Sequence, residues 1–452
     1  MQSRFKRFFL IALFFFAYSG AFGQNGRVIS VKEAIEIALE NNATLNATRE
    51  ALRASQHGTQ KARSNLFPKA DLEFGYSRLD PGTVRRGNVF VDVARTLVDT
   101  FNAGDPNDIR PGAYDNNFST VFQVVQPIYN GGANWAAVNL AKSREAGTVH
   151  ELEDTRQQTI LEVKSRYFRT LQAQELLAVS KKSLELSEEH LSSSRKMFEV
   201  GMRSRTEVLR WEVQKASNEG ALIEARNNLK IAFAALKQIM GLPQEEQFGL
   251  APVAFEPDSL MNSLEDQIHQ SVAKHPRLKT VNASVNAQHA GVRAAWSAFQ
   301  PKVNFIYRLG WEQNNTLALD SFSFWSAGVS VSFPLFHSLG NWSNLQESKA
   351  KLNRLEHLQT ESKRTLTFEV IRARLNVESA YKRIQIAKKA AEQAEENLRV
   401  LNNTFEVGLA ANIDVVDAEV IHRRAQTDLI NARYDFLIAR AQLDRATGQI
   451  SE

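Results

Sequence analysis

The spacing of hydrophobic residues changes along each half of this 452-residue chain. Residues 31–66 and 264–299 carry apolar side chains every three or four positions, which predicts a helix in each segment. The period then becomes two in four segments of about ten residues, which predicts four β-strands in two pairs. These strands are expected at about 69–79, 115–126, 302–312 and 322–333. Their alternating positions are Leu72, Phe74 and Tyr76; Phe118, Thr120, Phe122 and Val124; Val303, Phe305, Tyr307, Leu309 and Trp311; and Trp325, Ala327, Val329, Val331 and Phe333.

Long helices are predicted after each strand pair, at about 133–199 and 341–406, where no proline interrupts the chain. A rise of 1.5 Å per residue would make each about 100 Å long. The second helix has a strict seven-residue repeat, which predicts a left-handed supercoil, and small residues in the seam let helix axes approach closely. The two interleaved series are Val370, Val377, Ile384, Ala391, Leu398 and Phe405, and Leu366, Ala373, Ala380, Ala387, Ala394 and Leu401.

A partner helix is predicted to follow each long helix, at 204–240 and 412–446. Gly201 and Gly408 end the long helices, and glycine suits the left-handed conformation just past a helix end. Ser204 and Glu207 have the spacing of a capping box at the start of the next helix. Each half of the chain is therefore predicted to form a long helical hairpin.

The two halves are an internal repeat. An offset of 233 residues aligns Pro68 with Pro301, and an offset of 207 aligns Pro127 with Pro334 and residues 198–201 with 405–408. This divides the chain into a first repeat at 24–242, a linker at 243–263 and a second repeat at 264–449. The change of offset places an insertion in the first half, and its turn-forming residues predict a long surface loop over about 80–114.

Residues 1–23 have the pattern of a secretory signal: a basic start, eleven apolar residues from Phe8 to Tyr18, and a run of small residues. An uncleaved anchor is the other interpretation, but eleven residues are too few to cross about 30 Å of hydrocarbon as a helix. The longest apolar run further along is Ile231 to Leu236. If the exported chain enters a membrane, it must therefore cross as strands.

Four strands are too few for a closed barrel, but three chains of four strands would supply twelve. Strands of about ten residues with an apolar, aromatic-rich face are typical of transmembrane barrels. A soluble sandwich or an appended hairpin fits the strand pattern equally well at this point.

Composition removes several functional classes. The chain has no cysteine, which excludes disulfides, thiolate metal sites and cysteine nucleophiles. Loss of Arg4, Lys6 and Arg7 with the signal would lower the formal charge from +5 to +2, so a nucleic-acid partner is not expected. The nine histidines lack metal-ligand spacing and no catalytic motif is present, so we expect no metal, no cofactor, no catalytic residues and no enzyme activity.

Short motifs stand in a fixed order near the end of the second half: residues 405–409 (FEVGL), 414–418 (DVVDA), 431–434 (NARY) and Gly448, several of them repeated in the first half. In this duplicated order after a predicted signal, they resemble the TolC family of outer-membrane efflux ducts over essentially the whole mature sequence. The resemblance implies a mainly α fold with a transmembrane β part. It also implies a homotrimer, in which one 12-stranded barrel crosses the outer membrane and a tapered α-helical coiled-coil tube extends through the periplasm.

The resemblance also implies roles for particular residues. Four prolines match turns between barrel and tube, at Pro68, Pro127, Pro301 and Pro334. The hairpin tips match positions that dock a periplasmic adaptor, or membrane fusion, protein: Val200, Gly201, Met202, Val407, Gly408 and Leu409. Charged rings narrow the tube near the tips in this family, and the candidates here are Glu395, Arg399, Glu188 and Glu189. These charged residues can also be read as an ordinary solvated face.

Two functional interpretations remain at this stage. The first is an outer-membrane exit duct that works with an adaptor and an inner-membrane transporter of the RND or ABC type, in drug-type efflux, metal-ion efflux or type I secretion. The second is an exported coiled-coil scaffold of the cell envelope, which would need no outward aromatic strand faces. The sequence does not identify a transported substrate.

Overall fold

A computed structural model describes residues 27–109, 113–254, 263–314, 323–336, 338–406 and 409–451. The predicted signal segment, 1–23, lies outside these residues, as do Val407 and Gly408. The chain forms two compact units, described separately below. The sheet unit comprises Thr48–Glu153 and Pro276–Thr365, and the hairpin unit comprises Met1–Ala47, Asp154–His275 and Leu366–Glu452.

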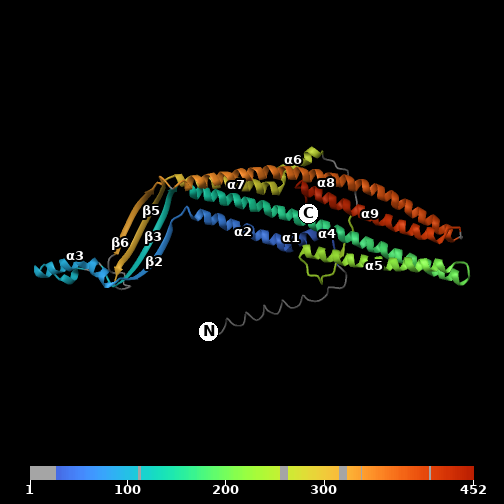
Figure 1. The fold of residues 1–452 in the computed structure, drawn as a ribbon, viewed down its shortest axis with the longest axis horizontal. Coiled ribbons are helices and arrows are strands. Elements are labelled where there is room, and N and C mark those ends of the chain that lie inside the picture. Colours follow the sequence, from blue (N-terminus) through green and yellow to red (C-terminus); the bar gives the residue numbers. More distant parts are fainter. Residues whose placement is uncertain are drawn as a thin grey trace, which may run out of the picture. The chain divides into compact units, whose positions relative to one another are not determined.

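The sheet unit is built around four antiparallel strands in the order β2-β3-β5-β6 (Figure 1). They are β2 (Lys69–Arg78), β3 (Asn116–Asn130), β5 (Lys302–Asn314) and β6 (Ser323–Ser332). The helices α2 (Ala43–Ser64) and α7 (Pro276–Trp296), the latter extended by the 3-10 turn η2 (Ser297–Phe299), lead into β2 and β5. The first parts of α4 (Ala133–Glu199) and α8 (Gly340–Glu406) lead away from β3 and β6.

The strand register places the alternating apolar residues on one face of the sheet. Leu72 lies opposite Phe122, which lies opposite Leu309, which lies opposite Trp325. One residue along each strand, the row on the other face is polar and consists of Asp71, Gln123, Arg308 and Ser326. Trp325 is 71% exposed and Phe74 is 70% exposed, so no described residue of the chain covers the apolar face at these positions.

Both edges of the sheet are open in the described chain, because β2 pairs only with β3 and β6 only with β5. An unpaired edge presents free N–H and C=O groups along its length. These groups need another strand or water.

The hairpin unit holds α1 (Val31–Asn41), α5 (Arg205–Met240), α6 (Leu264–Lys274) and α9 (Asn412–Ala446) with the later parts of α4 and α8. Two short strands, β1 (Val28–Ile29) and β4 (Gly249–Leu250), pair in parallel beside them. The α8 seam packs on small residues of α9, as the heptads predicted. Its contacting residues are Val370, Val377, Ile384, Ala432, Ala439 and Ala446.

The helices predicted at 31–66 and 264–299 are each broken, at Asn42 and at His275. The Asn42 side chain accepts from the Leu45 N–H at 3.0 Å and donates to the Ile239 carbonyl at 3.0 Å, which starts a new helix there. His275 is extended because Pro276 follows it and a residue before proline avoids the helical region. The break residues are repeat mates, and each contacts the end of the last helix in its own half.

The segment predicted as a long surface loop instead contains a helix, α3 (Pro81–Thr100), followed by the 3-10 turn η1 (Pro106–Asp108). Asp80 caps α3 by accepting from the N–H groups of Gly82 and Thr83, at 2.9 and 3.1 Å. Proline at the first position costs no hydrogen bond. The prediction was wrong because Asp80, Pro81 and Gly82 were interpreted as turn formers, and they form a helix start.

None of the helices in the described ranges is both long and apolar enough to cross a bilayer.

Candidate functional site

The tip of the first hairpin is a glycine-terminated helix end followed by a tight turn. Gly201 has φ +75°, so it adopts the left-handed conformation that the sequence predicted. The Met202 N–H donates to the Met197 carbonyl at 2.8 Å, and the Gly201 N–H donates to the Phe198 carbonyl at 3.0 Å. This pair of bonds is the Schellman arrangement. Val200 and Met202 flank the glycine and are 70% and 75% exposed.

The second tip is described on its α9 side. Leu409 is 84% exposed, and its N–H donates to the Thr404 carbonyl at 2.9 Å. The Asp414 carboxylate accepts from the Ala411 N–H at 3.3 Å, at the start of α9. The predicted docking residues of both tips are thus apolar and exposed wherever the structure describes them.

The expected capping box at the first tip does not form. Ser204 does precede α5, but its hydroxyl makes no capping hydrogen bond. The Glu207 carboxylate pairs instead with Arg203, at 3.0 Å. The Arg203 side chain also contacts the second hairpin, where its guanidinium carbon lies 4.1 Å from the centre of the Phe405 ring. Glu207 therefore pairs with Arg203 and does not close a capping box with Ser204.

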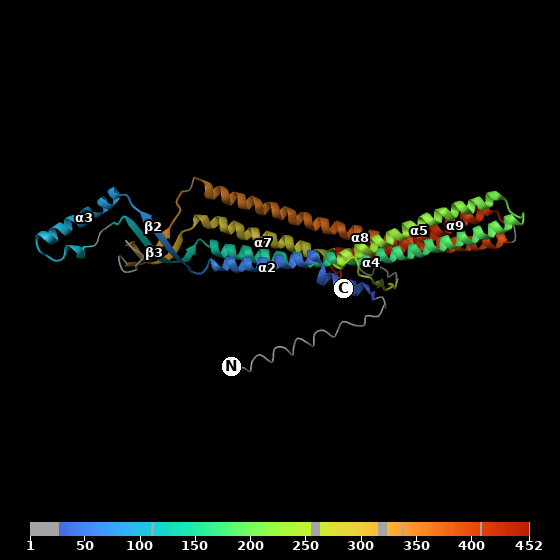
Figure 2. The same ribbon diagram turned by 90° about the horizontal axis from the view of Figure 1, so that it is seen from below.

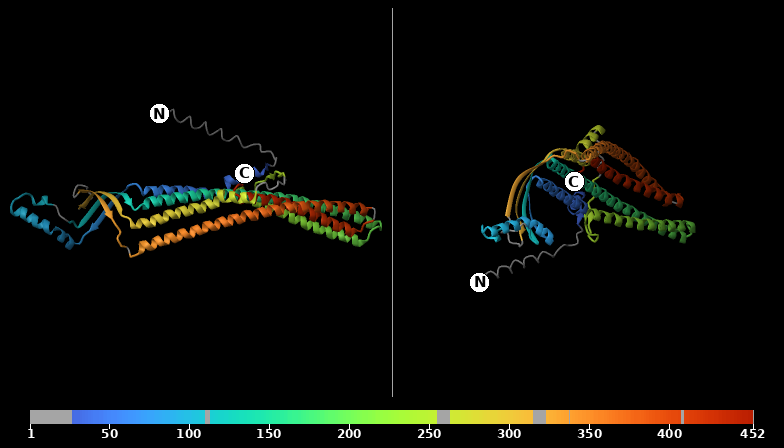
Figure 3. Two further views of the ribbon diagram at one scale, coloured as in Figure 1. Left: turned by 90° about the horizontal axis from the view of Figure 1, so that it is seen from above. Right: turned by 60° about the vertical axis from the view of Figure 1, so that its left-hand side comes forward.

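The two hairpin ends are packed together by a small apolar cluster, and they lie side by side in Figures 2 and 3. The fully buried Trp211 is its largest member, and the Asn412 side chain adds a hydrogen bond to the Glu207 carbonyl at 3.2 Å. Contacts between the hairpins fix where the exposed tip residues point. The buried cluster members are Leu191, Val208, Trp211, Phe405 and Val415.

A buried carboxylate lies beside this cluster. Glu419 of α9 is only 8% exposed, and its Oε1 lies 3.7 Å from Nε2 of His190 on α4, whose ring stacks on Trp211. Burial raises the pKa of Glu419 to about 7, an effect that nearby Arg423 partly opposes. A carboxyl group that is buried away from water keeps its proton more tightly than one in water, because burial disfavours the charged form. The sequence did not predict this group, because nothing in the helical pattern marks position 419 as buried.

The four aperture candidates all lie on exposed helix faces in the single chain. Arg399 does not reach Glu395 and instead donates to Glu396, at 2.7 Å. Glu188 pairs with Lys215 of α5 at 3.1 Å, and Glu189 is exposed. The structure therefore brings no two of the four candidates together within one chain in the contacts it describes.

Three of the four junction prolines flank strands. Pro68 and Pro301 immediately precede β2 and β5, and Pro334 follows β6 by two residues. Pro127 lies inside β3, which continues to Asn130 and not to 126 as expected. The register with β5 shifts just after Pro127, and such an irregularity accommodates a residue that has no N–H.

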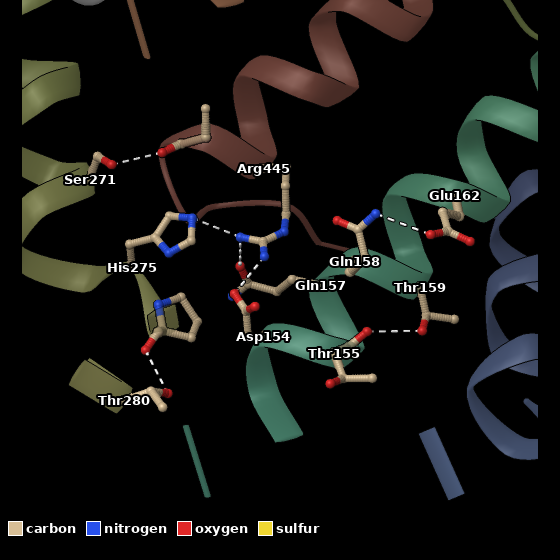
Figure 4. A network of polar contacts seen from close by, with 12 residues as sticks. Asp154, Thr155, Gln157, Gln158, Thr159, Glu162, Ser271, His275, Thr280 and Arg445 are labelled. Atoms are coloured by element: carbon tan, nitrogen blue, oxygen red, sulfur yellow. Dashed lines mark hydrogen bonds and ion pairs between the residues drawn. The ribbon is translucent and has the colours of Figure 1, made fainter. Parts of the chain in front are cut away.

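A polar cluster that the sequence did not predict links the end of α9 to α4 and to the helix break at His275 (Figure 4). Arg445 donates to Asp154 of α4 and to Nε2 of His275, the latter at 2.8 Å, and Ser271 donates to the Ala446 carbonyl at 2.7 Å. The ion pair with Asp154 is largely shielded, since the Arg445 side chain is 12% exposed. Charge and spacing could not reveal this cluster, because its members lie up to 291 residues apart.

Comparison with known proteins gives a consistent picture. The family model described as outer membrane efflux protein matches residues 34–242 and 267–449. Outer membrane protein TolC of Vibrio cholerae is 24% identical, over 98% of this chain and 96% of TolC. The alkaline protease secretion protein AprF of Pseudomonas aeruginosa is 22% identical, over 94% of this chain and 85% of AprF.

Solved structures share the fold. CusC, described in terms of transmembrane channel formation, superposes with a TM-score of 0.78 at 15% identity and covers 95% of each chain. The outer membrane protein VceC from Vibrio cholerae superposes with a TM-score of 0.76 at 17% identity, over 92% of this chain and 96% of VceC.

We predict that Glu419 makes the stability of the hairpin unit depend on pH. Because the folded pKa of about 7 lies above the ordinary carboxyl value, the folded state holds this proton more tightly. The resulting stabilisation is complete below the unfolded pKa and is lost as the pH rises through 7, by about 2 to 3 kcal/mol. Glu419→Gln should therefore flatten the fall in thermal unfolding midpoint between pH 5 and pH 8, followed by circular dichroism in detergent.

The control is Glu224→Gln, which changes an exposed carboxylate of α5. It should leave the pH dependence as it is. If Glu419→Gln keeps the full pH dependence of the original chain, then Glu419 is not its source.

Proposed function

Because this chain belongs to the outer membrane efflux protein family, we propose that three copies of it assemble into one exit duct that carries substrates out through the outer membrane. The protein is an efflux or secretion channel of the outer membrane and not an enzyme. The alternative of an envelope scaffold is not supported.

The observation that carries the proposal is the four-stranded sheet with one exposed apolar face and two open edges. A strand edge cannot face lipid, because its backbone groups would lack hydrogen-bond partners. Pairing β6 of one copy with β2 of the next satisfies both edges, and three copies of four strands close a barrel of twelve. The apolar face then meets the lipid of the outer membrane, and the row of Asp71, Gln123, Arg308 and Ser326 faces the water-filled interior.

The junction prolines fit this arrangement. Pro68 and Pro301 stand where the chain enters the sheet from a helix, and Pro334 where it leaves the sheet for one, and at each strand end a proline leaves no backbone donor unpaired. Pro127 at the irregular end of β3 serves the same transition. We assign this end of the sheet to the periplasmic side, where the helices continue as the tube.

We expect the detergent-solubilised protein to be a trimer. Native mass spectrometry should give the mass of three chains, since a monomer would expose two strand edges. A stable monomer as the main species would refute the barrel.

The family and the exposed tips support a proposal for the partners. We propose that Val200, Gly201, Met202, Val407, Gly408 and Leu409 dock the hairpin of a periplasmic adaptor protein, which couples the duct to an inner-membrane transporter of the RND or ABC type. The exposed apolar residues beside Gly201 support the assignment, because exposed apolar side chains on an ordered turn can pack into a pocket of a partner protein. Names among the relatives include both efflux and protease secretion, so either class of pump fits.

Gly201→Val should uncouple the duct without unfolding it. A side chain at this position meets no atom within 4 Å, so the cost is backbone strain of about 1 to 3 kcal/mol at the turn. We expect normal trimer levels but lost efflux and lost crosslinking to the adaptor. Gly201→Asn is the matched control, because asparagine tolerates the left-handed conformation, and it should keep most of the function. Intact efflux with a collapse in trimer yield would show that the tip serves folding.

We propose that the duct narrows near the tips at charged rings, with Glu395 and Arg399 as the first candidates and Glu188 and Glu189 as the second. Exposed ion pairs such as Arg399 with Glu396 contribute little to stability because water screens them, so a ring built from such groups can open at small cost.

Replacing Glu395 and Arg399 together by Ala should raise the conductance of single ducts in a planar bilayer. The double variant Glu188→Ala with Glu189→Ala is the comparison. If only the second pair raises conductance, the aperture lies on α4, and if neither does, the candidates are wrong.

A further inference from the structure

The helix α3 carries an apolar stripe that its own unit leaves bare. Phe90 is 86% exposed and Phe101, just past the helix end, is 72% exposed. At 100° per residue the exposed apolar residues fall within one face about a third of the circumference wide. The members of this stripe are Val89, Phe90, Val93, Leu97 and Phe101.

The rest of the α3 surface consists of a packed face and an exposed polar face. One neighbouring face packs on the returning segment, where Asn88 exchanges hydrogen bonds with the backbone of Ala113, each at 2.9 Å, and Arg95 donates to the Ile109 carbonyl. The remaining face is exposed and polar, and it carries Arg85, Asp92, Thr96 and Asp99. The stripe is therefore a distinct third face.

Strand register fixes where α3 emerges. Lys69 pairs with Val125 at the end of the sheet that carries the prolines, whereas Arg78 pairs with Asn116 at the opposite end, and α3 begins three residues after Arg78 (Figure 1). The apolar face of the sheet reaches this end too, where the rings of Tyr76 and Phe118 lie 5.1 Å apart. The orientation rests on the proposed function, which puts the proline end toward the periplasm and hence α3 at the outer surface.

We propose that α3 lies flat in the outer leaflet of the membrane, with its apolar stripe among the acyl chains and Arg86 at anionic headgroups. A helix with an apolar stripe, a charged face and an exposed arginine at the start of the stripe, on the same face, suits an interfacial position, buried about 5 to 10 Å. The stripe then continues the lipid-facing surface of the sheet beyond the strand end.

Arg86 argues against a second copy as the occupant. It precedes Val89, Phe90 and Val93 by three, four and seven positions, so it lies on the same face as the stripe. If three copies packed their stripes together about a threefold axis, their equivalent arginines would be brought together, and like charges repel. In a membrane interface the same side chain reaches the headgroup phosphates while its stem stays apolar.

Single-cysteine labelling tests the proposal, because the chain has no cysteine of its own. Val93→Cys marks the stripe, Asp92→Cys the polar face of α3, and Leu72→Cys the apolar face of the sheet. Each trimer, reconstituted in nanodiscs of phosphatidylcholine and phosphatidylglycerol, carries an environment-sensitive fluorophore. Quenching is measured with a lipid that bears a nitroxide near the headgroup. Leu97→Cys replaces Val93→Cys if that variant fails to assemble.

We expect quenching at Val93 to approach that at Leu72 and to exceed that at Asp92 by about twofold, as for a helix with one face in lipid. Quenching at Leu72 but not at Val93 or Leu97 would overturn the interfacial helix and leave the duct intact. No quenching at Leu72 would instead refute the membrane-spanning sheet. Efficient disulfide formation between Val93→Cys copies in one trimer would overturn the proposal in favour of a second copy as the occupant.

Discussion

The pairing register of the four strands is the constraint on which the rest of this protein depends. A slip of one residue would turn every side chain of a strand to the opposite face. It would move Leu72 out of line with Phe122 and place Asp71 among apolar side chains. The observed register keeps the apolar rows in phase across all four strands and leaves two open edges, on which the proposed assembly of several chains rests. The fold of the sheet depends on this alignment, and the proposed membrane insertion and trimer rest on it.

The hairpin unit holds the exposed apolar residues of its tips, the proposed docking surface, in fixed positions. Surface ion pairs cannot do this, since exposed pairs contribute little. The position of the tips comes instead from the buried cluster around Trp211 and Phe405 and from Arg203, which reaches from one hairpin to the other. The tip residues can therefore remain apolar and uncovered without collapsing onto their own chain. In the proposed complex with an adaptor, an ordered tip would lose less entropy on binding.

Buried polar groups hold the helices of this unit in one arrangement. Arg445 joins Asp154 and His275, which lie far apart in sequence, and Asn42 bonds to the end of α5. A buried charge that loses its partner is costly, so each such contact penalises other packings of similar helices. Gly241 and Gly448 mark the same place in the two halves, and both have positive φ. A side chain on Gly241 would lie 2.8 Å from the Asn41 carbonyl oxygen, which explains why this close approach requires glycine.

Hydrophobic periodicity predicted the long helices and the four strands of the sheet, because these are set by which residues can share an apolar face over many positions, and alignment of the chain with itself revealed the duplication. Periodicity did not predict α3 or the helix breaks at Asn42 and His275. The left-handed conformation of Gly201 could also be predicted from the sequence, because few other residues adopt a positive φ easily. Local chemistry misled where one motif serves two purposes: Asp80 and Pro81 begin a helix as readily as a turn, and Glu207 has the spacing of a cap but pairs with Arg203. Glu419 beside His190 and Arg445 beside Asp154 could not be predicted from the sequence. These contacts join helices hundreds of residues apart, and only the packing of those helices decides which charged side chains lose their water.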